Sequence, residues 1–192
     1  MEKYLTEEFI LDSYLDLCKF LQNKYGIPKG NYFLTKTCKS PNAKIKRTKE
    51  GLFIHHIKEN EAVLLSETKG AIIQPFEYQQ AENLCYCNYL EHLILHYKIF
   101  LESMDELKKG SNKLLGIQGI VCKTIPEIND YFNGYNYKSA RYIKSLSLVD
   151  QKSFEELKKF LWISINKIPN NFLDFKMKAY AVLILNKGIM TQ

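Results

Sequence analysis

Apolar residues recur at intervals of three and four along residues 89–109, which is the spacing of one face of an amphipathic helix. This stripe consists of Leu90, Leu93, Ile94, Tyr97, Leu101 and Met104. Asn88 precedes it and Glu91 follows three residues later, a pairing in which each side chain caps a backbone amide at a helix start. The pattern therefore predicts a helix that begins near Tyr89.

Two short segments upstream of this helix have the composition of strands. Residues 51–57 (GLFIHHI) and 84–87 (LCYC) are rich in apolar, aromatic and β-branched side chains. Residues 59–81 between them form an enlarged loop with room for a helical turn near residues 62–66. We therefore expect the order strand, loop, strand, helix.

The flanks of the chain show mainly helical patterns. Further helices are expected over residues 6–24, 113–132, 153–167 and 171–186, with Thr6 and Ser153 as caps of the first and third. Residues 131–142 are predicted to be a loop rich in aromatic side chains. These patterns predict an α+β fold that is mainly helical, with a small embedded ββα element.

The chain has 192 residues, of which 46% are apolar, and this suits one compact domain. We divide it into an N-terminal helix (1–28), a basic arm (29–50), a ββα core (51–109) and a C-terminal helical region packed on that core (110–192). No apolar run is long enough for a membrane span, and the N-terminus lacks the layout of a signal peptide. We expect a cytoplasmic location.

The formal net charge is +6, and much of the excess lies in residues 29–49, which contain no acidic residue. Lysine and arginine contact nucleic-acid phosphates without sequence preference. The candidate nucleic-acid contacts are Lys36, Lys39, Lys44, Lys46, Arg47 and Lys49. A solvated loop is the alternative, but the run leads directly into the strand of residues 51–57.

All four histidines of the chain lie within residues 51–100. His92 and His96 are one helical turn apart, so their Cβ atoms are roughly 5–6 Å apart, a separation that suits two imidazoles on one metal ion. His55 and His56 are adjacent on a strand and so point to opposite faces. We expect one of them to bind the metal and the other to act beside it, whereas a surface or core-edge histidine pair is the simpler alternative.

The order HHI, Asn-Leu and EHxxxH resembles the HNH, or ββα-metal, endonucleases, a family that includes colicin-type DNases and phage and homing nucleases. The resemblance covers about 50 residues and matches His55 and His56, Asn83, and His92 with His96. It departs from compact members in the 27-residue step from His56 to Asn83. Asn60 and Asn88 are therefore alternatives for the central asparagine.

The resemblance implies that His55, His92 and His96 bind one divalent cation and that His56 is the general base. Asn83 would hold the loop and the base in register. The family hydrolyses DNA phosphodiester bonds to 5′-phosphate and 3′-hydroxyl ends. Imidazole ligands favour Mn²⁺, Ni²⁺, Co²⁺ or Zn²⁺, although family members often use Mg²⁺.

Other readings of the same residues stay open. The histidines would serve equally in a non-catalytic nucleic-acid-binding protein with structural zinc, and the enzyme would otherwise be an RNase. Glu91 is expected to cap the helix, and Glu59 to be a solvated loop carboxylate, with a place beside the metal ligands as the alternative. The five cysteines form no CxxC pair and are expected to be buried free thiols, with a zinc site that recruits Cys38 as the alternative.

Overall fold

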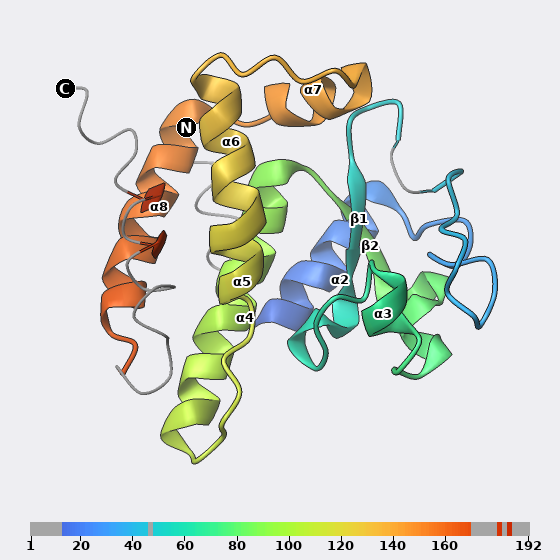
Figure 1. The fold of residues 1–192 in the computed structure, drawn as a ribbon, viewed down its shortest axis with the longest axis horizontal. Coiled ribbons are helices and arrows are strands. Elements are labelled where there is room, and N and C mark those ends of the chain that lie inside the picture. The colour runs from blue at the N-terminus through green and yellow to red at the C-terminus, as the bar shows by residue number, and fades with distance from the viewer. Residues whose placement is uncertain (1–12, 46–47, 170–179, 182–183, 186–192) are drawn as a thin grey trace.

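The computed structural model describes residues 13–45, 48–169, 180–181 and 184–185. The described chain is mainly helical with one small antiparallel sheet, so the expected α+β class is confirmed (Figure 1). Its strands are β1 (Phe53–His56) and β2 (Leu84–Cys87). Its α-helices are α2 (Tyr14–Tyr25), α3 (Thr68–Ala71), α4 (Tyr89–Lys108), α5 (Ile117–Gly119), α6 (Ile125–Phe132), α7 (Ala140–Ser147) and α8 (Gln151–Asn166). The 3₁₀ turns η1 (Ile57–Asn60), η2 (Phe76–Gln79) and η3 (Ala81–Asn83) and the π-helical segment η4 (Ile120–Thr124) complete the elements.

The sheet leads directly into the long helix α4. β1 and β2 pair antiparallel with His55 opposite Cys85, and β2 ends one residue before the cap of α4. The Asn88 side chain accepts a hydrogen bond from the Glu91 amide at 2.9 Å, and the Glu91 carboxylate accepts one from the Asn88 amide at 2.7 Å. The predicted capping arrangement is thus confirmed, and the strand, loop, strand, helix order is present.

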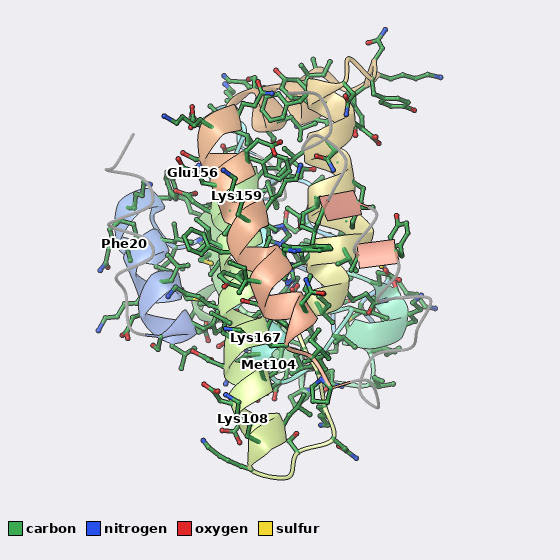
Figure 2. The ribbon with its side chains drawn as sticks, turned by 90° about the vertical axis from the view of Figure 1, so that its left-hand side faces the viewer. Phe20, Met104, Lys108, Glu156, Lys159 and Lys167 are labelled. Carbon is green, nitrogen blue, oxygen red and sulfur yellow. The ribbon has the colours of Figure 1, made fainter. Side chains whose placement is uncertain are left out.

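One core of buried residues runs through most of the described elements. It joins α2, the sheet, α4, η4 and α8, and includes Leu17, Leu21, Cys85, Cys87, Leu93, Val121, Phe154 and Leu157. Figure 1 shows α2 beside the sheet, and in Figure 2 α8 crosses the face of the molecule between α2 and α6. The residues outside the ββα element therefore supply a large part of its packing.

A second, smaller core lies beneath the basic arm. It consists of Tyr32, Phe33, Cys38, Ile45, Ile54, Ala71 and Leu84. This core fixes the loop of residues 29–45 against β1, β2 and α3. Hydrogen bonds add to this packing: the Tyr32 amide donates to the Gln79 carbonyl at 2.8 Å, the Thr68 hydroxyl donates to the Cys38 carbonyl at 2.7 Å, and an isolated bridge joins Phe33 and Pro41.

Several helix boundaries differ from the predictions. α2 begins at Tyr14 because the extended Ser13 caps it by accepting from the Asp16 amide, whereas Thr6 lies outside the described residues. α8 begins at Gln151 because Asp150 accepts the hydrogen bond from the Ser153 amide, so Ser153 is not its cap. The helix predicted over residues 6–24 therefore does not continue unbroken through Ser13, and the start of α8 was mispredicted because several residues near it have side chains that can cap.

Other predicted elements also moved. Residues 140–147 form α7, although residues 140–142 were predicted as loop, and the turn expected near residues 62–66 forms instead as α3. Leu101 is 39% exposed, so it does not belong to the buried stripe of α4. The helix expected over residues 171–186 lies mostly outside the described residues. Helices of the described part of the chain are all too short or too polar to cross a membrane.

Candidate metal centre

Four side chains from three elements meet beside the sheet, and we call them the metal group. His55 comes from β1, Glu59 from η1, and His92 and His96 from α4, and one potential ligand atom of each lies within 4.8 Å of the others. The three histidines are buried, whereas Glu59 has 17% of its side chain exposed. The strand and the helix thus bring together the three imidazoles that the sequence proposed as ligands.

Three distances within this group, whose ligand atoms lie up to 4.8 Å apart, are close to those expected around a single ion. His92 Nε2 lies 3.1 Å from His96 Nε2, and a Glu59 oxygen (Oε2) lies 3.5 Å from His96 Nε2 and 3.7 Å from His55 Nδ1. Ligands at about 2.0–2.1 Å from a tetrahedral zinc ion lie roughly 3.3–3.4 Å from each other. The donor set of imidazoles and one carboxylate is also one that zinc and its neighbours in the transition series accept.

Tyr14 fixes the orientation of His55 from the neighbouring helix α2. The hydroxyl oxygen of Tyr14 is 2.8 Å from His55 Nε2 and 2.9 Å from the carbonyl oxygen of Ile57. A carbonyl only accepts, so the single hydroxyl proton satisfies Ile57, and the hydroxyl oxygen accepts from the Nε2–H of His55. This tautomer leaves the lone pair on His55 Nδ1, which is buried without a hydrogen-bond partner among the described residues.

His56 points away from the metal group, as expected for the adjacent residue on a strand. Its Nε2 lies 2.9 Å from Oε1 of the buried Gln79, whose amide nitrogen donates to the Leu65 carbonyl at 3.2 Å. That second bond orients the amide so that its oxygen faces His56, which therefore donates through Nε2. His56 Nδ1 then faces Oε1 of Glu59 at 3.8 Å.

Asn83 does not reach this arrangement. Its side-chain nitrogen donates to the carbonyl oxygen of Glu77 at 2.8 Å, and no contact with His56 is found in the described structure. Gln79 makes the contact with His56 that the family resemblance led us to expect of Asn83. Asn88, one of the alternatives, caps α4.

Burial controls the protonation of the group. Desolvation raises the pKa of Glu59 to about 7, an effect that the positive charge of Lys123 opposes. Desolvation lowers the pKa of His96 to about 3 and that of His56 to about 4, and it also lowers the pKa of His55. At neutral pH these imidazoles are therefore uncharged, the form in which histidine binds metals.

A cavity of about 530 Å³ opens beside the metal group. Glu59, His92 and His96 line it together with Tyr32 and with residues of the segment from Gly116 to Glu127, whereas His55 and His56 do not. A molecule that enters the cavity therefore meets Glu59 and the two helical histidines first.

Gly119 forms the closest wall of the site. A Cβ at this position would lie 2.5–2.7 Å from three atoms of the His96 ring, closer than side chains approach in real structures. The backbone of Gly119 is helical, so a glycine is required here by the approach of His96 and not by the main-chain conformation.

The lysines of the basic arm lie elsewhere on the surface. Lys36, Lys39, Lys44 and Lys49 are exposed, and none of them lines the cavity. Lys46 and Arg47 lie outside the described residues. The arm contributes Tyr32, whose ring centroid is 4.5 Å from that of His56. Nucleic-acid binding by the arm stays a prediction.

The cysteines form no part of the metal group. All five are free, and four of them are buried, whereas Cys122 is exposed and lines the cavity. The prediction of free thiols is confirmed, but the expectation that all are buried is wrong for Cys122. Cys38 does not join any cluster of potential metal ligands found in the described residues.

Comparison with protein-family models, with curated proteins and with solved structures finds no match to this chain. The geometry of the site is therefore the basis for any functional conclusion.

Sequence reasoning missed several residues that shape the site. Glu59 was expected to be solvated, but the 3₁₀ turn directly after β1 brings it back to His55, four residues earlier. The i,i+4 spacing of this carboxylate from a proposed ligand was an available signal. Tyr14, Gln79 and Gly119 left no comparable signal, since their roles arise from contacts over 14 or more residues along the chain.

Proposed function

We propose that this chain is a metal-dependent phosphodiesterase that hydrolyses DNA, with His55, His92 and His96 as the ligands of one divalent cation. The observation that carries the proposal is the convergence of these buried imidazoles, from a strand and from the helix that follows the sheet, next to a cavity of about 530 Å³. The same strand and helix positions hold the metal in the HNH nucleases that the sequence resembles.

The residues around the ion would divide the work. A divalent cation held here would supply a Lewis acid that stabilises negative charge on a phosphate oxygen. Glu59 lines the cavity, so its carboxylate is placed to accept a proton from an attacking water molecule. His56 is buried behind Glu59 and its Nε2 is occupied by Gln79, so we assign it the role of holding the Glu59 carboxylate in place.

This assignment modifies the expectation from the resemblance, in which His56 itself is the base. A water molecule in the cavity contacts Glu59 and not His56, because His56 is absent from the lining. The roles of Glu59 and His56 are separable by experiment. Replacement of Glu59 should remove cleavage, whereas replacement of His56 should weaken cleavage to a smaller extent.

A second candidate function rests on a specific observation. Glu59 completes a set of four ligand groups, and closed sites with four protein ligands are typical of structural zinc. In that case the chain would be a non-catalytic nucleic-acid-binding protein. Glu59 would then contribute to metal affinity and to the free energy of unfolding, and not to any reaction.

The test is a cleavage assay with matched variants. Supercoiled plasmid and a single-stranded RNA are each incubated with the purified protein in Mg²⁺, Mn²⁺, Ni²⁺, Co²⁺ or Zn²⁺, alongside Glu59→Gln, His92→Ala and the control Glu82→Gln. Glu82 is an exposed carboxylate that does not line the cavity. Bound metal is quantified for every protein.

The proposal expects metal-dependent nicking of the plasmid by the wild type and by Glu82→Gln. Glu59→Gln should be slower by on the order of 10²–10⁴-fold while it still binds one metal ion. Loss of metal from Glu59→Gln, together with no cleavage by the wild type, would establish the structural zinc site instead. Cleavage of RNA alone would reassign the substrate, and full activity in His92→Ala would refute the metal site.

A further inference from the structure

The π-helical segment η4 carries a lysine into the cavity beside the metal group. Lys123 is exposed, and it lines the cavity together with Glu59, His92 and His96. Its positive charge is felt within the group, because it lowers the pKa of His96 and of the Glu59 carboxyl. Lys123 is therefore close enough to act on a molecule held by these residues.

The position of Lys123 is fixed by the packing of its own segment. Gly119 lies directly against the His96 ring, so the main chain just before η4 cannot move closer to α4 or turn a larger side chain toward it. The Thr124 hydroxyl donates to the Gly119 carbonyl at 2.8 Å and so spans η4. π-helical turns are rare and occur frequently at functional sites. Here the turn fixes the position of the Lys123 backbone, from which the flexible side chain extends.

No described residue makes a direct contact with this charge. Neither an ion pair nor a hydrogen bond to the Lys123 ammonium occurs among the described residues, whereas Lys24 and Lys58 are paired with Glu91 and Glu61. The nearest carboxylate along the helix is Glu127, four residues later, and it interacts with the hydroxyl groups of Tyr89 and Tyr142, whose pKa values it raises.

An unpaired cation next to three imidazoles and a metal ion would be repelled by the ion. The Glu59 carboxylate offsets part of this repulsion, and an anion that lies in the cavity between the two positive charges would offset the rest. A phosphate group is such an anion, since its oxygens accept charge-assisted hydrogen bonds from lysine while another oxygen faces the metal group. The cavity between Lys123 and the histidines is the place where both contacts are possible.

We infer that Lys123 binds the phosphate group that is to be cleaved, an inference that rests on the proposed phosphodiesterase function. Lys123, and not a lysine of the basic arm, would then make the phosphate contact at the metal group. The arm lysines would bind phosphates farther along the DNA.

The test compares Lys123→Gln with Lys123→Arg and with Lys159→Gln. Lys159 is an exposed lysine of α8 that faces outward in Figure 2 and does not line the cavity, so it controls for the loss of one positive charge. Three measurements are made on each full-length protein: metal affinity by titration, binding of a 20-base-pair DNA duplex at several salt concentrations, and the cleavage rate of the same duplex.

Replacement of Lys123 should have opposite effects on the binding of the metal and on the binding of DNA. Lys123→Gln should bind the metal at least as tightly as the wild type, because a repelling charge is gone. It should bind DNA with a salt dependence whose slope is smaller by about 1, and cleave it with a kcat/KM about 10- to 100-fold lower. Lys123→Arg should keep most of the activity, and Lys159→Gln should behave as the wild type in metal binding and cleavage.

Two results would overturn the inference and leave the proposed function intact: cleavage by Lys123→Gln at the wild-type rate, or equal losses in Lys123→Gln and Lys159→Gln. If the wild type does not cleave any polymer, the proposed function fails. The binding measurements then still decide whether Lys123 contacts a phosphate, since an unchanged salt slope in Lys123→Gln would exclude it.

Discussion

Replacement of Gly119 by alanine tests the metal centre most directly. The added Cβ would lie 2.5 Å from Cε1 of His96, about 0.9 Å closer than the 3.4 Å at which ordinary contacts begin. The backbone at this position is already helical, with φ of −61°, so the alanine strains no dihedral angle. The perturbation is therefore confined to the distance between the segment and the His96 ring.

The expected losses of stability and of metal affinity follow from how much displacement the packing and the metal site each tolerate. Overpacking of a buried site costs about 1–3 kcal/mol, and replacing a helical glycine by alanine returns about 1 kcal/mol, so the metal-free protein should lose about 0–2 kcal/mol. Ligand distances in metal sites tolerate only about 0.2 Å. A displacement of His96 by several times that amount should weaken metal binding by at least 10- to 100-fold.

The assay is a titration with Zn²⁺ or Co²⁺, combined with thermal unfolding with and without metal. At a metal concentration 100 times the wild-type Kd, a 100-fold weaker variant should lose over 2 kcal/mol of metal-dependent stabilisation. Asp130→Ala, at an exposed position of α6 that does not line the cavity, is the control and should bind as the wild type does. Metal affinity of Gly119→Ala within twofold of the wild type would refute the proposed role of His96 as a ligand.

Further predictions concern the residues around the ligands. Tyr14→Phe removes the hydroxyl that orients His55 and should weaken metal binding about 10- to 100-fold in a titration. Unchanged metal affinity would exclude this role of Tyr14. Gln79→Leu should lower the free energy of unfolding in urea by about 1–3 kcal/mol because it leaves buried groups unpaired, whereas the less buried Asn83→Ala should change it by under about 0.5 kcal/mol. The pKa of His56 is lowered from 6.5 to about 4 in the folded protein, so as the pH falls the unfolded chain binds a proton at His56 before the folded protein does. The stabilisation that is present above pH 6.5 is therefore lost as the pH falls toward 4. Urea midpoints of the metal-free protein should therefore fall more steeply between pH 7 and pH 4.5 than those of His56→Gln, and parallel curves would contradict the shift.

The sequence identified the parts of the site that depend on local spacing. The capping pair Asn88 and Glu91 located the start of α4, and the i,i+4 spacing of His92 and His96 placed both on one side of that helix. The alternation of a strand correctly separated His55 from His56. These inferences need only the repeat of one element, so no knowledge of tertiary packing was required.

The remaining parts depend on how distant segments pack. Gln79 reaches His56 because the long loop folds back through η2, and no spacing rule gives the path of a loop of this length. Lys123 was assigned to no function because the cavity that it lines is formed by a segment after α4. The described lysines of the basic arm do not line the cavity, whereas Lys123 does, and nucleic-acid binding by the arm stays a prediction.

The hydroxyl of Tyr14 contacts His55 of the strand, and Gly119 lies against His96 of the helix, so two of the candidate ligands are supported by residues outside the ββα element. An excised fragment of residues 51–109 would lack both supports, and it should neither load metal nor act as a minimal nuclease. During synthesis the chain would likewise remain incompetent until the segment that contains Gly119 has left the ribosome and docked. Nascent chains would therefore have no activity toward nucleic acid until folding is complete.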